Sequence, residues 1–225
     1  MRGKNPIRPP VSDDGAILGV KNIFATLQGE GPHAGVPSVF LRLGGCNLAC
    51  DFCDTEFEDY KSVAIVEIAQ KIEELSLNNA GIRVRKLVVI TGGEPMRQNI
   101  APLCDLLVAN GFNVQIETNG TLYRELPPEV DIVCSPKNTG QGYMKLRGDL
   151  LSRVSALKFI ISASDEKYKN IGNVGQELYN IPVYVQPMDE KDDTKNAANR
   201  QLAVELAMQY GYRMSLQTHK ILKID

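Results

Sequence analysis

The chain has 225 residues, of which 43% are hydrophobic and 23% are charged, and its net charge is −2 at pH 7. This composition is typical of a globular soluble protein, and the length suits one domain. No apolar stretch approaches the roughly 18 residues of a membrane span, and residues 1–10 are basic without an apolar core, so they do not predict a secretory signal. The mixed charge indicates neither a nucleic-acid nor a membrane partner. The odd number of cysteines, five, favours a reducing cytoplasm over a disulfide framework.

Strand and helix signals alternate after an N-terminal arm of residues 1–20, whose first ten residues are expected to be mobile. Amphipathic patterns predict helices at 63–77, 99–110 and 196–210, and the polar stretch 189–199 is expected to be a solvated loop. Such alternation predicts βα units with a parallel sheet. Eight units would need about 250 residues, so we predict an α/β fold, a partial, open barrel of about six parallel strands in one domain of residues 21–225. Strands are expected at 21–26, 38–43, 86–90, 113–116, 131–134, 156–161, 182–185 and 213–216.

Unusual residues follow the ends of the predicted strands. In parallel α/β folds, ligands bind at the carboxyl ends of the strands, so these segments are expected to meet at one face. They are the cysteine loop after residue 43, 91–95, 117–120, 135–137, 186–187 and 217–220.

The cysteine loop carries Cys46, Cys50 and Cys53 in the spacing Cys-x3-Cys-x2-Cys. Thiolates select iron–sulfur clusters, zinc or copper(I), and three of them leave one iron of a four-iron cluster open. A structural zinc site would need a fourth ligand, and His33 is the only histidine nearby; zinc sites usually pair their cysteines, whereas ferredoxin-like clusters use four. The loop therefore favours an open four-iron cluster. Cys104 and Cys134 are expected to be core residues.

Two further segments suit a cofactor. Gly92 and Gly93 would let a ligand approach the backbone, and Glu94 offers a carboxylate to a ligand ammonium. Without the cysteine loop this segment would be interpreted as a plain glycine turn capped by glutamate. The segment 135–137 suits contact with a ribose or carboxylate, or is only a turn with a solvated lysine.

The cysteine spacing resembles that of the radical S-adenosylmethionine (SAM) family. The resemblance implies a [4Fe-4S] cluster whose open iron binds the methionine part of SAM, and an adenosyl radical formed by one-electron reduction. It implies that the glycine–glutamate motif binds the methionine amino group and that Phe52 lies near the adenine. The SAM-binding residues it implies are Phe52, Cys53, Asp54, Gly92, Gly93, Glu94, Ser135, Pro136, Lys137 and Gln186.

The segment before the cysteine loop narrows the substrate class. Gln28 offers a donor and an acceptor, and Glu30, between two glycines, offers two acceptor oxygens, which suits the edge of a heterocycle. Arg42 can bind a carboxylate with its planar fork. The alternatives are turn chemistry for Gln28 and Glu30 and a surface ion pair for Arg42.

Together these blocks resemble the family of 7-carboxy-7-deazaguanine synthases from about residue 22 to the C-terminus. The resemblance implies conversion of 6-carboxy-5,6,7,8-tetrahydropterin to 7-carboxy-7-deazaguanine and ammonia, in queuosine precursor synthesis. The radical would take hydrogen from C6 and the same hydrogen would return, so that SAM is regenerated. Also implied are Mg²⁺ on Thr55, an external electron donor of flavodoxin or ferredoxin type, and a homodimer. The implied substrate-binding residues are Leu27, Gln28, Gly29, Glu30, Arg42, Thr91, Gln217 and His219.

Two other functions remain open at this point. An activase that makes a glycyl radical on a partner enzyme has the same cysteine spacing, but it would need a groove for a protein loop. An electron carrier or a zinc-stabilised binding module is the non-enzymatic alternative. A lone histidine is more often structural than functional, so a structural role is the alternative for His219. The role of the terminal carboxylate of Asp225 is left open.

Overall fold

The computed structural model describes residues 5–224, so the question about Asp225 lies outside the described residues. The described chain forms two compact units. The first unit contains residues 5–28, Val36–Thr118 and Leu122–Asp131, and the second contains Gly29–Gly35, Asn119–Thr121 and residues 132–224.

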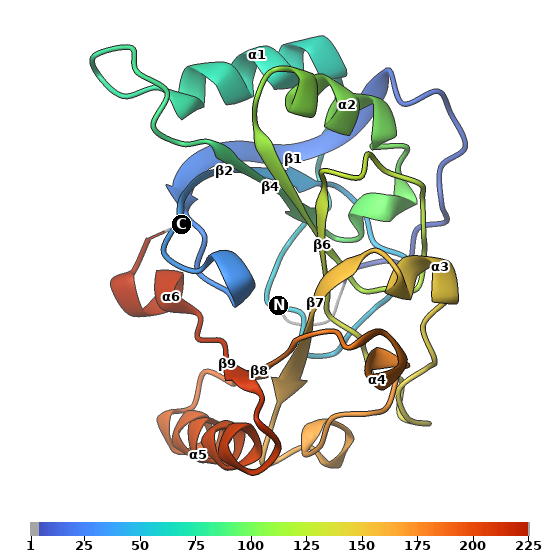
Figure 1. Cartoon of the computed structure of the whole chain (residues 1–225), viewed down its shortest axis with the longest axis vertical. Helices are drawn as coiled ribbons and strands as arrows, with labels where there is room; N and C mark the ends of the chain where they lie inside the picture. The colour runs from blue at the N-terminus through green and yellow to red at the C-terminus, as the bar shows by residue number, and fades with distance from the viewer. Residues whose placement is uncertain (1–4, 225) are drawn as a thin grey trace. The chain divides into compact units, whose positions relative to one another are not determined.

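The first unit is built on five strands in the order β3-β1-β2-β4-β5. Strands β2, β4 and β5 run parallel, whereas β1 pairs antiparallel with both β2 and β3. Helices α1 and α2 lie along this group of strands (Figure 1). The bounds are β1 Ile17–Leu27, β2 Pro37–Leu43, β3 Lys61–Ala64, α1 Ile65–Ser76, β4 Leu87–Gly92, the 3₁₀ turn η2 Pro95–Arg97, α2 Ala101–Ala109 and β5 Asn113–Thr118.

Buried apolar side chains hold the helices of the first unit against its strands. Strand β4 is buried on both faces along residues 87–90, which is the pattern of a central parallel strand. Ile68 and Ile72 of α1 are fully buried one turn apart, as are Leu103 and Leu107 of α2. Burying each such side chain contributes roughly 1.5–3 kcal/mol, so this spacing holds both helices against the sheet.

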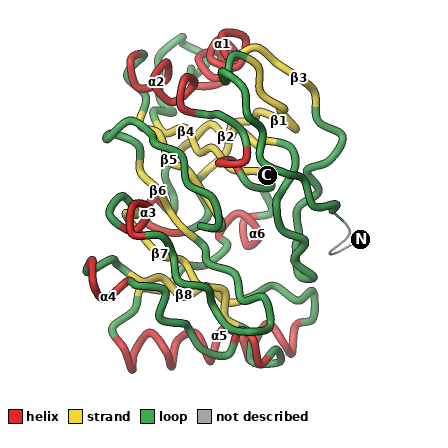
Figure 2. Tube along the Cα trace, turned by 90° about the vertical axis from the view of Figure 1, so that its right-hand side faces the viewer, coloured by secondary structure: helices red, strands yellow, loops and turns green. Residues whose placement is uncertain are grey.

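The second unit repeats the parallel arrangement with strands in the order β6-β7-β8-β9. The long helix α5 packs on β7, β8 and β9 (Figure 2). The bounds are the 3₁₀ turn η1 Gly31–His33, β6 Asp131–Cys134, α3 Gly148–Leu151, β7 Val154–Ile161, the 3₁₀ turn η3 Glu166–Tyr168, α4 Gln176–Tyr179, β8 Val183–Pro187, α5 Asp193–Tyr210, β9 Arg213–Met214 and α6 Thr218–Leu222.

The predicted fold class is confirmed as mixed α/β with a mostly parallel, open sheet. Several details of the strands differ from the predictions. The first strand is longer than predicted and antiparallel to its neighbour, and Val63 and Ala64 pair with it as part of β3 instead of opening α1. The last strand ends at Met214, because its pairing with β8 extends over only two residues.

The polar stretch 189–199 is not a loop throughout, since α5 begins at Asp193. The Asp192 carboxylate accepts a hydrogen bond from the amide of Lys195 at 3.0 Å, which caps the helix N-terminus. Asn199 is fully buried in the same region, and its amide donates to the carbonyl of Met188 at 2.9 Å. Residues 193–195 of α5 are polar because they face solvent, and exposed polar residues alone do not distinguish a helix from a loop.

The part of the first ten residues that the structure describes is hydrogen-bonded to the rest of the first unit. The amide of Arg8 donates to the carbonyl of Cys46 at 2.7 Å, and the amide of Val11 donates to the carbonyl of Arg97 at 2.7 Å. Backbone hydrogen bonds of this kind fix the segment, although its composition offers little apolar surface to bury. Within residues 5–224, no helix combines the length and hydrophobicity that crossing a bilayer requires.

Candidate active site

The cysteine loop begins where β2 ends. Cys46 is buried, and burial raises the pKa of its thiol to about 11. Its sulfur accepts from the amide of Leu48 at 3.4 Å, and the amide of Cys53 donates to the carbonyl of Cys50 at 3.1 Å. Among the described residues, no three His, Cys, Asp or Glu side chains are already gathered as a metal site. The donor set suits an iron–sulfur cluster, and binding a metal supplies the free energy that draws such thiols together and deprotonates them.

The two glycines after β4 lie against the start of the cysteine loop. A Cβ atom on Gly93 would stand 2.1 Å from the carbonyl oxygen of Gly45 and 2.8 Å from the Cβ of Cys46. Gly92 has φ of +140°, and a Cβ there would stand 2.1 Å from the carbonyl of Leu43. Only glycine tolerates this conformation and this approach. The structure therefore brings the predicted cluster loop and the predicted SAM motif together.

Glu94 is fully buried directly after these glycines. Its Oε1 accepts from the amide of Met96 at 3.0 Å and from the hydroxyl of Thr118 at 2.7 Å. These donors hold the carboxylate in one orientation, which suits an ammonium ligand. Thr118, at the end of β5, was not predicted as a site residue, although it follows a buried strand as the other candidates do.

Arg42 and Thr91 lie opposite each other in the register of β2 and β4. The Arg42 guanidinium lies 5.9 Å from the ring centre of Phe24, and its Nη1 donates to Thr55 Oγ1 at 3.5 Å. The hydroxyl of Thr55 in turn donates to Asp54 at 3.2 Å. The structure thus places a predicted carboxylate-binding arginine beside the predicted Mg²⁺ ligand.

Gln28 is buried at the end of β1 and is not a simple turn residue. Its amide donates to Glu117 Oε1 at 3.0 Å, and the Gln115 amide donates to the same oxygen at 3.1 Å. Leu27, just before Gln28, pairs with Pro37 in the register of β1 and β2. Glu117 is a carboxylate that the sequence analysis did not assign, and its position at a strand exit was the available signal.

In the second unit, Glu30 forms an ion pair with Lys158, a buried residue of β7. Gln217 also donates to Glu30, from Nε2 to Oε1 at 2.9 Å. Burial alone would raise the pKa of Glu30, but the charge of Lys158, together with both hydrogen bonds, lowers it to about 2. Glu30 is therefore a buried, ionised acceptor. Lys158 was missed, although a lysine inside the apolar run 156–161 was the signal for it.

His219 lies against Gly29 in the same unit. A Cβ on Gly29 would stand 2.1 Å from Nδ1 of His219, so glycine is required there. The amide of Thr218 donates to the carbonyl of Gly29 at 3.0 Å, which fixes the start of α6 on this loop. The predicted residues at 29–30 and 217–219 are therefore neighbours.

The remaining predicted residues occupy strand exits and loops. The ammonium of Lys137 donates to the hydroxyl of Ser135 at 2.6 Å and to its carbonyl at 2.8 Å across Pro136. Gln186 is buried near the end of β8 and accepts from the hydroxyl of Ser215 at 2.8 Å. Phe52 is half-buried in the cysteine loop. Cys104 and Cys134 are fully buried, which confirms them as core residues.

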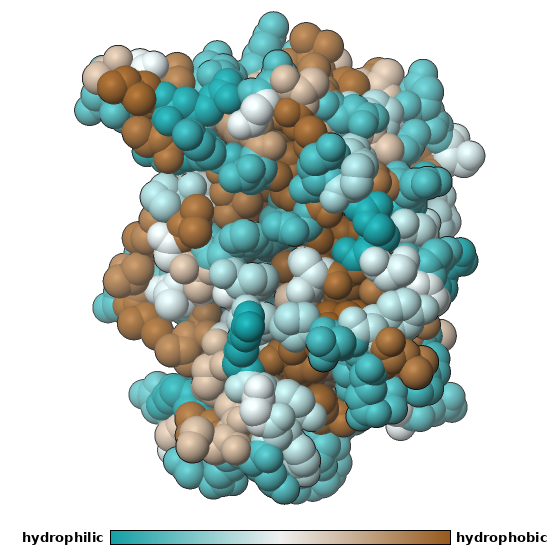
Figure 3. All heavy atoms as spheres, viewed as in Figure 1, coloured by the Kyte–Doolittle hydropathy of each residue, from teal (hydrophilic) through white to brown (hydrophobic). Residues whose placement is uncertain are grey.

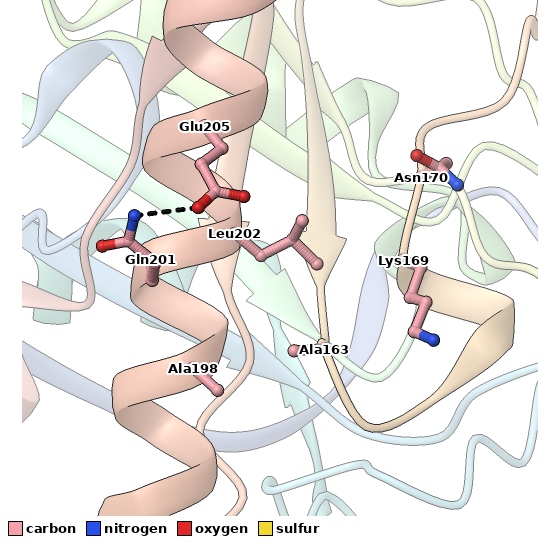
Figure 4. Close-up of a pocket in the computed structure, with 7 residues that line it drawn as sticks. All are labelled: Ala163, Lys169, Asn170, Ala198, Gln201, Leu202 and Glu205. Atoms are coloured by element: carbon pink, nitrogen blue, oxygen red, sulfur yellow. Dashed lines mark hydrogen bonds between the residues drawn. The ribbon is translucent and has the colours of Figure 1, made fainter.

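A surface hollow of about 380 Å³ lies elsewhere in the second unit, between α5 and the segment after η3 (Figure 4). It contains none of the predicted site residues. Gln201 and Glu205 of α5, which line it, hydrogen-bond to each other at 2.9 Å.

Comparison with known proteins decides between the functions left open. Residues 41–133 match the Radical SAM superfamily. Over its full length, the chain is 57% identical to the 7-carboxy-7-deazaguanine synthase of Rickettsia prowazekii, and the match covers 96% of that protein. It is 40% identical to that of Rhodospirillum rubrum, with both chains fully covered.

The chain belongs to the 7-carboxy-7-deazaguanine synthase family.

The fold agrees with this family. The crystal structure of QueE from Escherichia coli superposes with a TM-score of 0.70 at 26% identity, covering 89% of this chain and 93% of that one. The resemblance predicted from the sequence is therefore confirmed, and the chain is a radical SAM enzyme of queuosine precursor synthesis. A [4Fe-4S] cluster and SAM follow from the family. The glycyl-radical activase, the electron carrier and the zinc module have no support in these relatives.

Proposed function

We propose that this enzyme converts 6-carboxy-5,6,7,8-tetrahydropterin to 7-carboxy-7-deazaguanine and ammonia. The observation that carries the proposal is the 57% identity over the whole chain to a synthase of that name. The contact between the cysteine loop and Gly93 supports it, because the cluster and SAM residues of such an enzyme must be adjacent.

The residues of the first unit fit the cofactors. Cys46, Cys50 and Cys53 would hold the [4Fe-4S] cluster, and Glu94 would accept from the ammonium of SAM. When bound, the cluster and SAM supply one-electron chemistry, whereas the protein positions and shields the reacting atoms. We assign the rest of the SAM contacts to Phe52, Cys53, Asp54, Gly92, Gly93, Ser135, Pro136, Lys137 and Gln186.

The polar side chains of the predicted substrate site suit a charged pterin. Glu30, kept ionised by Lys158, would accept from ring N–H and amino donors, and Gln28 would add a donor and an acceptor. Arg42 would bind the pterin carboxylate. Further contacts are assigned to Leu27, Gly29, Thr91, Gln217 and His219.

Magnesium is the third proposed cofactor. Mg²⁺ prefers oxygen ligands and keeps several bound waters. One protein hydroxyl and one substrate carboxylate are therefore enough as its other ligands. Thr55 offers its hydroxyl beside Asp54 and Arg42, which supports a site where the ion and the pterin carboxylate would meet.

The proposal is tested by anaerobic reconstitution followed by incubation with SAM, dithionite and the carboxypterin. We expect ultraviolet absorbance of a deazapurine to appear, ammonia to be released, and the rate to rise with Mg²⁺. Thr55→Val should lose the Mg²⁺ response while keeping its iron and its affinity for SAM. Release of 5′-deoxyadenosine without deazapurine would contradict the proposed substrate, and an unchanged Mg²⁺ response in Thr55→Val would contradict the proposed ligand.

We further propose a cytoplasmic homodimer that takes electrons from a flavodoxin- or ferredoxin-type donor. The surface over α6 supports the dimer, because apolar side chains gather there (Figure 3). Ile221 and Leu222 are 67% and 57% exposed, and such a patch favours a protein partner. A second copy of the chain is the occupant we propose.

Light scattering should therefore give twice the mass of the chain. Ile221→Asp should shift the protein toward the monomer, because a buried charge opposes association. Leu178→Asp is the matched control, since Leu178 is 86% exposed on α4, away from the patch. A monomeric wild type, or a dimer that is insensitive to Ile221→Asp, would refute this interface.

A further inference from the structure

Residues 5–11, here called the N-terminal strap, lie along both ends of the cysteine loop. At the first end, Ile7 forms a parallel bridge with Cys46, and the amide of Arg8 donates to the Cys46 carbonyl at 2.7 Å. The strap thus pairs with the backbone of a predicted cluster ligand as a strand would pair with its neighbour.

At the other end of the loop, Asn5 contacts the last cysteine. Its Nδ2 donates to the carbonyl of Thr55 at 2.9 Å and lies 3.8 Å from the sulfur of Cys53. One amide group therefore donates both to the backbone just after Cys53 and to the Cys53 sulfur.

The buried side chain of Arg97 also holds the strap in place. Arg97 donates to the carbonyl of Pro9 at 3.1 Å and to the carbonyl of Gly44, two residues before Cys46, at 3.0 Å. Its own carbonyl accepts from the amide of Val11 at 2.7 Å. The same side chain therefore positions the strap and the entrance of the cysteine loop.

The strap is held by these specific bonds and not by apolar burial. Ile7 is 66% exposed, so it stabilises little by leaving water. Arg8 adds an ion pair with Glu58 at 2.7 Å, but this pair is partly exposed, so water and salt screen it and it contributes little. Segments held mainly by hydrogen bonds persist where each bond has a fixed partner, and here the partners include Cys46 and Cys53 of the cysteine loop.

We propose that the N-terminal strap is part of the cluster site and that Asn5 is a positioning residue for it. This inference rests on the proposed cluster ligands. Donors near the ligating sulfurs stabilise the reduced cluster, because reduction adds negative charge to the sulfurs. The Asn5 amide therefore raises the midpoint potential of the cluster. By fixing the end of the loop, it also slows the loss of iron.

The test compares anaerobically reconstituted wild type, Asn5→Leu and Asn5→Gln, in the full chain. Leucine has the size of asparagine without its donor, whereas glutamine restores an amide. Ile7→Ala is the matched control, because it changes an exposed side chain of the same strap and leaves the backbone bonds in place. The measurements are iron and sulfide content, the rate of iron loss to a chelator, and the midpoint potential from electron paramagnetic resonance during a redox titration.

We expect Asn5→Leu to shift the midpoint potential to a more negative value and to lose iron about fivefold faster, the ratio typical of one lost hydrogen bond. Asn5→Gln should recover part of both effects, and Ile7→Ala should match wild type. Equal potentials in wild type and Asn5→Leu would overturn the positioning role even if iron loss were faster. A wild type that assembles no cluster would instead overturn the proposed function, so the two failures are distinguishable.

Discussion

Glu94→Gln is expected to weaken SAM binding by at least about 30-fold, the ratio that corresponds to 2 kcal/mol for a buried charge pair that loses one charge. Glutamine has the shape of glutamate, and its carbonyl can still accept from the amide of Met96 and the hydroxyl of Thr118. The variant therefore removes the charge without opening a cavity. The measurement is the dissociation constant for SAM by anaerobic equilibrium dialysis, with iron content determined on the same sample.

Thr118→Val is the matched control for this variant. It leaves the charge of Glu94 in place and removes one of its donors, so the dissociation constant should rise only about fivefold. Glu94→Gln protein that holds its full iron and binds SAM as tightly as wild type would show that Glu94 is not the ammonium acceptor.

Lys158→Met is expected to lower the free energy of unfolding by about 3–5 kcal/mol at pH 7, because it leaves the Glu30 carboxylate buried without its counter-charge. Methionine retains much of the length and apolar character of the lysine stem, so packing changes little. The double variant Lys158→Met with Glu30→Gln removes both charges and should recover most of the loss. Denaturant unfolding of the three proteins measures this, and a double variant no more stable than Lys158→Met would contradict the electrostatic explanation.

The ion pair between Glu30 and Lys158 also predicts that the pH dependence of stability reverses when Lys158 is replaced. In wild type the pKa of Glu30 is lowered to about 2, so its contribution to stability is complete above the pKa of the unfolded chain and is lost as the pH falls toward 2. In Lys158→Met, burial is opposed only by the smaller effects of the Gln217 hydrogen bond and the charge of His219, so the pKa of this carboxyl is expected to rise above the unfolded value. Lowering the pH then protonates the buried group and relieves its cost. The difference in unfolding free energy between the two proteins should therefore shrink between pH 7 and pH 4.

Local signals carry the predictions for the cofactor half of the site. The cysteine spacing and the glycines before Glu94 are short motifs in which each residue type has its own chemical reason. The structure adds that Gly93 must be glycine because the carbonyl of Gly45 occupies the space of a side chain. Such a constraint appears in the sequence as a conspicuous glycine even before its neighbour is known.

Long-range partners were not predictable in the same way. Glu30 and Lys158 are separated by 128 positions, and nothing in either segment specifies the other. Lys158 was detectable only as a charge inside an apolar strand, and Glu117 only as a carboxylate after one. Their pairing depends on which strands become neighbours, which is a property of the whole fold.

The amino-acid sequence by itself determined the alternation of strands and helices, the three-cysteine loop and the family, because each of these depends on residues close together in the chain. Only the tertiary structure decided that β1 runs antiparallel, that Lys158 keeps Glu30 ionised, and that residues 5–11 line the cysteine loop. The physical reason is that backbone hydrogen bonds and buried ion pairs form between whichever groups folding brings together. Backbone groups are the same in every residue, so a segment bound mainly through them leaves almost no trace in its composition.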